Sequence, residues 1–318
     1  MGRVSELANH FLEAVDQAAI ASAKWRGKGD KMAADAAAVE AMRLTFDNVP
    51  FDGRVAIGEG ERDEAPMLYI GEQLGCEIGN PNVAAIDIAV DPLECTNNCA
   101  DNLPNSIAVL AAAPRGTLLH APDCYMDKIA AGPEMEGQIS LDGGVAYNIE
   151  QVASVLDKPV DEVRIIALDR PRHRDLFREI NEIGAKLHLL GDGDIAAALW
   201  AARPEGDHDM LLGIGAAPEG VITATAIRGI GGVFEGRLVF RSDEEKARAG
   251  GMVDDDLTRL WTAKDLCQSD DAIFVASGVC DGYLPGVKID EDGTTHTFAE
   301  MINVESKQLS RHDRIHSL

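Results

Sequence analysis

The chain opens with two segments whose apolar residues recur at the spacing of an α-helix. In residues 4–22, apolar side chains fall three or four positions apart while acidic side chains occupy the opposite face. A second, alanine-rich segment from about Ala33 to Leu44 shows the same period and stops before Asn48-Val49-Pro50. Both segments are predicted to be amphipathic helices.

Short apolar runs bounded by turn residues follow, and such runs are typical of β-strands. They cover residues 54–57, 83–90, 107–112 and 117–120. The run from 83 to 90 has the strongest strand character. We expect it to end at Asp91-Pro92, because proline offers no backbone N–H to a neighbouring strand.

Beyond about residue 148 the pattern alternates between strands and helices, which favours an α/β fold. Strands are expected at 163–168, 187–190, 210–215 and 272–278, and helices at 172–184, at 195–202 and from Pro218 onward. The least periodic stretch is 148–159. We therefore expect two domains, 1–148 and 149–318.

Composition narrows the class of protein. Of 318 residues, 46% are hydrophobic and 26% are charged, which is ordinary for a globular protein and excludes a disordered acidic tail. The formal charge of −25 disfavours nucleic-acid polymers and anionic membranes as partners, but not a small phosphate ester at a locally positive or metal-loaded site.

Two further absences in the sequence bear on where the protein works. No apolar run reaches the ~18 residues that span a bilayer, and the amino terminus lacks a signal-peptide core. The six cysteines include no paired CxxC motifs, which argues against a secreted disulfide scaffold and against structural zinc. We expect a soluble, cytoplasmic protein.

Acidic residues gather at the ends of predicted elements, in residues 29–35, 58–64, 87–96 and 216–219. In the third segment Asp87 and Asp91 share a strand face, and the following turn brings Glu94 back toward Asp91. Neighbouring carboxylates repel unless one is protonated or a hard cation such as Mg²⁺ or Mn²⁺ binds them. Each acidic turn, taken alone, is more often solvated surface than a metal site.

Thr96 adds a hydroxyl to this acidic turn, at the start of the next element, where exposed backbone N–H groups can receive a phosphate. Carboxylates, a hydroxyl and N–H donors in one turn suit the metal-assisted attack of water on a phosphate ester.

Longer motifs carry a family resemblance. Asp91-Pro92-Leu93-Glu94-Cys95-Thr96 resembles the Asp-Pro-x-(Asp/Glu)-Gly-(Ser/Thr) signature of the lithium-sensitive sugar-phosphatase superfamily, and residues 58–72 resemble class II fructose-1,6-bisphosphatases. Further matches to that family, in the same order, are residues 24–31, 121–126, 170–173, 191–194 and 213–221. Residues 96–100 are closer to the form in photosynthetic bacteria, which also hydrolyses sedoheptulose 1,7-bisphosphate.

The resemblance implies a fold and an activity. The fold would be a layered α-β-α-β-α sandwich of the sugar-phosphatase type, with an N-terminal metal-binding catalytic domain (1–148) and a C-terminal sugar-phosphate-binding domain (149–318). A homodimer or homotetramer would hydrolyse the C1 phosphate of fructose 1,6-bisphosphate, and also sedoheptulose 1,7-bisphosphate, in gluconeogenesis or the Calvin cycle. Two sites would hold Mg²⁺ or Mn²⁺.

The resemblance also implies residue roles. Thr96 would act on the attacking water, with Glu61 and Lys31 beside the metal ligands. The metal ligands would be Asp35 and Glu59 for one cation, and Asp91, Glu94 and Glu219 for the other. Substrate would be bound by Glu94, Cys95, Thr96, Tyr125, Arg170, Pro171, Arg172, Asp192, Gly193, Asp194 and Ala216. Arginine suits bidentate phosphate recognition, and aspartate suits sugar hydroxyls.

Three positions depart from the family pattern, because Cys95, Ala36 and Ala216 stand where the family has glycine. If the turn requires a positive φ at Cys95, the side chain is strained there by roughly 1–2 kcal/mol. These departures motivate one alternative, a catalytically impaired sugar-phosphate-binding homologue; another is a phosphatase for a different small phosphate such as an inositol phosphate. Cys95 and Cys99 flank Thr96 and are either idle thiols or a redox control.

Overall fold

A computed structural model describes residues 2–58, 60, 67–253 and 256–316. The chain forms two compact units, the first from residues 1–118 and 268–318 and the second from residues 119–267. This division differs from the expected one at 148/149. Residue 148 lies inside helix α4 (Gly144–Val155), and the C-terminal strands return to the sheet of the first unit.

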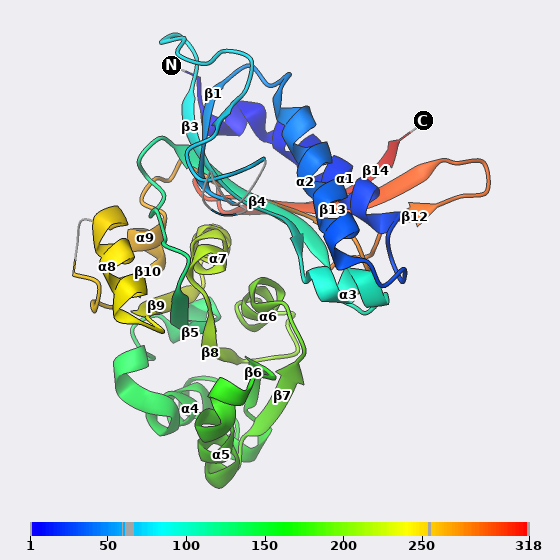
Figure 1. Ribbon diagram of the computed structural model, residues 1–318. Helices are drawn as coiled ribbons and strands as arrows, with labels where there is room; N and C mark the ends of the chain where they lie inside the picture. The colour runs from blue at the N-terminus through cyan, green and yellow to red at the C-terminus, as the bar shows by residue number, and fades with distance from the viewer. Residues whose placement is uncertain (1, 59, 61–66, 254–255, 317–318) are drawn as a thin grey trace. The chain divides into compact units, whose positions relative to one another are not determined.

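The first unit is built on a mixed sheet with the strand order β12-β13-β11-β4-β3-β1-β2, and β14 pairs with β13 (Figure 1). β1 and β3 run parallel, and the other neighbours are antiparallel. The strands are β1 (Asp52–Ile57), β2 (Gln73–Leu74), β3 (Ala85–Glu94), β4 (Ile107–Pro114), β11 (Ile273–Gly278), β12 (Lys288–Ile289), β13 (Thr295–Asn303) and β14 (Gln308–His316).

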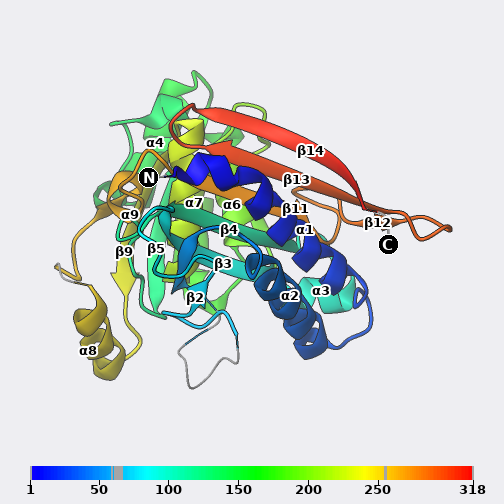
Figure 2. The same ribbon diagram turned by 90° about the horizontal axis from the view of Figure 1, so that it is seen from above.

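Helices α1 (Ala8–Ala23) and α2 (Lys31–Phe46) pack together over this sheet, and the short α3 (Thr96–Asp101) follows β3 (Figure 2). α1 turns the fully buried Phe11, Val15 and Ala18 inward, so the predicted amphipathic face is confirmed. α2 begins at the N-cap Asp30, whose side chain accepts a hydrogen bond from the Ala33 N–H.

The second unit contains another mixed sheet, in the order β10-β9-β5-β8-β6-β7. Its strands are β5 (Tyr125–Ala131), β6 (Arg164–Leu168), β7 (Lys186–Leu190), β8 (Met210–Ala216), β9 (Val233–Val239) and β10 (Trp261–Thr262). Its other helices are α5 (Arg174–Ile183), α6 (Asp194–Ala201), α7 (Ala217–Ile230), α8 (Asp243–Met252) and α9 (Ala263–Leu266). α7 crosses β5 so closely that a Cβ on Gly220 would lie 2.6 Å from the Met126 sulfur.

The predicted α/β class is confirmed, since each unit combines a mixed sheet with packed helices. The strands expected at 54–57, 83–90, 107–112, 163–168, 187–190, 210–215 and 272–278 correspond to β1, β3, β4, β6, β7, β8 and β11. The run 117–120 is not a strand, because it leads from one unit to the other. Among the described helices, none is long and apolar enough to cross a membrane.

Candidate active site

The end of β3 carries the acidic turn, and a β-bulge shapes it. Three steps along β3, from Asp91 to Glu94, match only two steps along β4. Because side chains alternate along a strand, the extra residue lets Glu94 join Asp91 on one face. A carboxylate oxygen of each lies within 4.8 Å of the other. β3 therefore continues past Pro92, contrary to the expected end there, because a bulge tolerates the missing N–H.

Hydrogen bonds fix the turn that follows. The Leu93 N–H donates to Asp91 Oδ1 at 3.1 Å, and the Thr96 hydroxyl donates to the Leu93 carbonyl at 2.9 Å. The Ser106 hydroxyl donates to the Cys95 carbonyl at 2.8 Å. Thr96 is the first residue of α3 and comes two positions after Glu94, at the end of the bulge.

Cys95 adopts the left-handed conformation, with φ 64° and ψ 50°, and is buried. Because φ is positive at Cys95, its side chain is strained in this turn. All six cysteines are thiols rather than disulfides in this structure.

Of the remaining predicted metal ligands in the first unit, Asp35 lies among the described residues and Glu59 does not. Asp35 is half-buried in α2, one turn after the exposed Lys31, and burial raises the pKa of its carboxyl. Ala36, next to it, is exposed. Glu59 and Glu61 lie outside the described residues.

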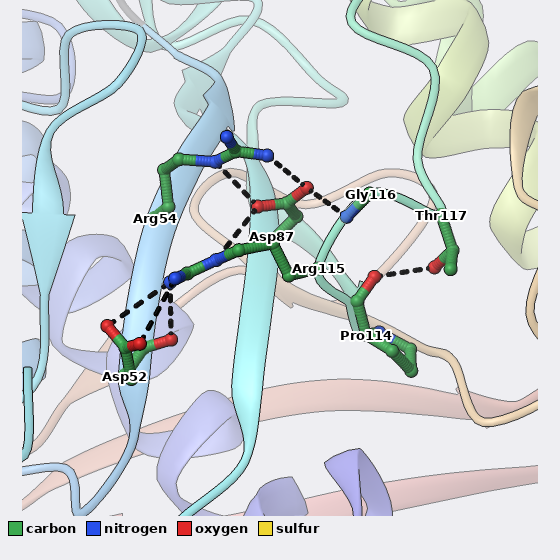
Figure 3. Close-up of polar contacts among 7 residues, drawn as sticks. All are labelled: Asp52, Arg54, Asp87, Pro114, Arg115, Gly116 and Thr117. Carbon is green, nitrogen blue, oxygen red and sulfur yellow. Dashed lines mark hydrogen bonds and ion pairs between the residues drawn. The ribbon is translucent and has the colours of Figure 1, made fainter. Parts of the chain in front are cut away.

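Asp87, which shares β3 with Asp91, has a different role (Figure 3). It is fully buried and accepts two hydrogen bonds from Arg54, at 2.9 and 2.7 Å, and one from the Gly116 N–H at 2.7 Å. Arg54 is its register partner on the parallel strand β1. Both carboxylate oxygens are thus used to align β1 with β3.

In the second unit, Tyr125 begins β5 and contacts two guanidinium groups. The Arg172 Cζ lies 4.6 Å from the ring centroid and the Arg241 Cζ lies 5.0 Å from it. Arg170 pairs with Asp192 at 3.0 Å. The structure therefore joins the predicted Tyr125 to Arg172 and the predicted Arg170 to Asp192, and it adds Arg241, which the sequence analysis missed.

The 3-10 turn Pro171–His173 holds Arg172 through the backbone of β8. Arg172 donates from Nε and Nη2 to the Ile214 carbonyl, at 2.9 and 2.6 Å. The Ile214 N–H donates to His173 Nε2 at 2.7 Å, which leaves the proton on Nδ1, 2.7 Å from the Leu168 carbonyl. Burial lowers the pKa of His173. His173 is buried and both of its ring nitrogens are occupied, so it holds the backbone next to Arg172 in place.

Asp194, the first residue of α6 after the left-handed Gly193, is held by a lysine that the sequence analysis missed. Lys128 Nζ lies 2.5 Å from Asp194 Oδ2, and both side chains are buried. A buried ammonium needs such a partner. The one signal for Lys128 in the sequence is a lysine directly before the apolar run Ile129-Ala130-Ala131.

The start of α7 carries the last two predicted residues. Ala216 ends β8 opposite Tyr125 and is the N-cap of α7. Pro218 and the half-buried Glu219 lie in the first turn, where a carboxylate is favoured by the helix dipole.

Known proteins are similar in sequence to this chain over almost its whole length. A relative from Prochlorococcus marinus (strain MIT 9515), named D-fructose 1,6-bisphosphatase class 2/sedoheptulose 1,7-bisphosphatase, is 45% identical over 302 residues, covering 91% of this chain and 90% of its own. Relatives of the same name from Thermosynechococcus vestitus and Synechococcus sp. (strain JA-3-3Ab) are each 42% identical, covering 96% and 98% of this chain and 94% and 96% of their own.

The model of the family described as "Bacterial fructose-1,6-bisphosphatase, glpX-encoded" matches residues 5–316. The motifs that suggested this resemblance therefore reflect common descent along the chain, and the protein belongs to the glpX-encoded family of bacterial fructose-1,6-bisphosphatases.

Proposed function

We propose that this protein is a divalent-metal-dependent phosphatase that releases the C1 phosphate of fructose 1,6-bisphosphate and also acts on sedoheptulose 1,7-bisphosphate. The relatives' names give both activities for those proteins. The observation that carries the proposal is the bulge that brings Asp91 and Glu94 onto one face, directly before Thr96.

The donor set fits a hard cation. Asp91 and Glu94 offer carboxylate oxygens within 4.8 Å of each other, and like charges so placed are stabilised by Mg²⁺ or Mn²⁺. We assign Asp91, Glu94 and Glu219 to one cation, and Asp35 and Glu59 to a second. When bound, these cations supply positive charge that offsets the charge developing on the phosphate.

Thr96 is assigned to orienting the attacking water. Its hydroxyl proton is already given to the Leu93 carbonyl, so its oxygen is left as an acceptor for a proton of that water. A threonine hydroxyl is too weak a base to deprotonate water at neutral pH, so a carboxylate must assist. Glu61 and Lys31 are the proposed neighbours of the metal ligands in this role.

The second unit is assigned to substrate recognition. Arg170 and Arg172 suit the distant phosphate, and Asp192 and Asp194 suit the sugar hydroxyls. Lys128 positions Asp194 through their ion pair. His173 positions Arg172 through the backbone of Ile214. The other proposed contacts are Glu94, Cys95, Thr96, Tyr125, Pro171, Gly193 and Ala216. We further propose a cytoplasmic homodimer or homotetramer that serves gluconeogenesis or the Calvin cycle.

Phosphate release tests the proposal. Fructose 1,6-bisphosphate, sedoheptulose 1,7-bisphosphate and inositol monophosphate are each supplied with Mg²⁺, Mn²⁺ or a chelator. We expect release from both sugar bisphosphates that the chelator abolishes. Glu94→Gln should reduce kcat/KM by at least about 100-fold, whereas Glu40→Gln, an exposed acid on α2, should not. Sugar-bisphosphate binding without turnover supports the impaired homologue, and release from inositol monophosphate alone supports the other alternative.

A further inference from the structure

β14 forms an outer edge of the sheet in the first unit. It pairs with β13 over nine positions, from Thr295 opposite His316 to Asn303 opposite Gln308. Among the strands that the structure describes, none pairs with the other side of β14, and Figure 2 shows it running along the sheet margin. An edge of this length presents backbone N–H and C=O groups that can pair with another strand.

This edge is held in place before any partner binds. Arg314 reaches α1, where it pairs with Asp16 at 2.7 Å and with Glu13 at 2.6 Å. His316 Nε2 lies 2.9 Å from the Thr297 hydroxyl on β13. A strand that is already ordered loses little conformational freedom when it pairs.

The other face of the strand carries exposed side chains. Because side chains alternate, Arg311, Asp313 and Ile315 share the face opposite to Arg314, and all three are exposed. Ile315 keeps 66% of its surface exposed, the second highest value among the large hydrophobic side chains described as exposed. An apolar side chain this open on a sheet edge gains from being covered.

The order of residues on that face is self-complementary. β14 runs from Gln308 to His316, so its midpoint is His312. In an antiparallel pair of two β14 strands around a two-fold axis at His312, Arg311 faces the partner's Asp313, and Leu309 faces the partner's Ile315. Moving the axis by one residue instead places Arg311 opposite its own copy, or Asp313 opposite its own copy. Opposite charges in facing positions stabilise a sheet, and like charges destabilise it.

We propose that β14 is a docking surface for a second copy of this chain, with the two β14 strands paired antiparallel about a two-fold axis at His312. The pairing makes one continuous sheet from the two copies. It sets a single register, because all nine residues overlap only when the axis lies at the midpoint. The interface does not depend on the catalytic proposal, since none of the residues assigned to the metal or the substrate lies on β14.

A charge reversal tests the register. Asp313→Arg turns both Arg–Asp pairs into Arg–Arg pairs, and we expect this variant to dimerise at least about tenfold more weakly through this interface. The double variant R311D/D313R restores opposite charges and should dimerise within about threefold of the original chain. Asp175→Arg on α5, where the side chain is 88% exposed, makes the same charge change and serves as the control. Sedimentation velocity over a concentration series gives the assembly state of each.

A mixing experiment separates lost pairing from lost folding. R311D alone carries two acids at these positions and D313R alone carries two bases, so each should self-associate weakly, whereas a one-to-one mixture should form heterodimers. Circular dichroism and the thermal midpoint show whether each variant is folded. The proposal is overturned if the original chain does not self-associate, if folded D313R assembles like the original, or if neither the double variant nor the mixture recovers.

Discussion

Cys95 is a residue whose backbone and side chain have opposing preferences. At φ 64° a Cβ is disfavoured by roughly 1–2 kcal/mol. The thiol is nevertheless buried, so part of the strain is offset by packing. Comparing cysteine with glycine directly would mix these two effects.

Two variants separate them. Cys95→Ala and Cys95→Gly both remove the sulfur, but only alanine keeps the Cβ. We expect the glycine variant to be more stable than the alanine variant by about 1–2 kcal/mol, the reverse of the order seen inside a helix. Urea unfolding measures the difference, and phosphate release shows whether kcat/KM rises with the relaxed turn. An alanine variant as stable as the glycine variant would show that this turn carries no left-handed strain.

At the scale of elements, the turn Pro171–His173 and strand β8 depend on one neutral imidazole. Gly213 on β8 has φ 140°, and a Cβ there would lie 3.0 Å from the His173 ring. The Ile214 N–H then donates to His173 Nε2, and the Ile214 carbonyl receives Arg172. A proton added to Nε2 would remove that acceptor and release the segment that carries Arg172.

Acid should therefore weaken this segment. Burial lowers the pKa of His173, so below about pH 6.5 the unfolded chain binds this proton more readily than the folded one. The stability given by neutral His173 is fully present above that pH and is lost as pH falls through the folded-state pKa. We expect the free-energy gap between the original chain and His173→Gln to narrow below about pH 6.5, and the KM of the original chain for fructose 1,6-bisphosphate to rise. A gap that stays constant down to pH 5 would contradict this.

Local patterns predicted elements better than they predicted their partners. The apolar run 83–90 indicates β3, and the acids after it indicate the pair Asp91 and Glu94, which the bulge brings together. β14 was missed because its sequence, Gln308 to His316, is largely polar, as an edge strand allows. The Lys128–Asp194 pair was missed because the two residues are 66 positions apart, and only the packing of α6 on β5 joins them.

Local sequence patterns also could not predict how the chain divides into its two units. β11 lies between β4 and β13, more than 150 residues after β4 in the sequence, and no periodicity in the sequence reports such a pairing. Two backbone hydrogen bonds show where the chain leaves and returns. The Gln268 N–H donates to the Thr117 carbonyl at 2.8 Å, and the Leu119 N–H donates to the Leu266 carbonyl at 2.9 Å. Residues 119–267 thus form an insertion whose ends lie side by side.

This topology predicts which pieces of the whole molecule fold alone. The second unit keeps all its strands and one core, from Ile129 to Val233, within 119–267, so that fragment should unfold cooperatively on heating. Residues 1–118 lack Ile273 and Val275 of β11, which complete the first core, and should remain unfolded. Joining Leu118 to Gln268 through a short glycine-serine linker should restore the fold of the first unit, because these ends are already adjacent. Circular dichroism melts and amide NMR dispersion test all three chains. A fragment 1–118 that melts cooperatively would show that the first core does not need β11. A joined chain that stays unfolded would show that the first unit needs residues 119–267 to fold.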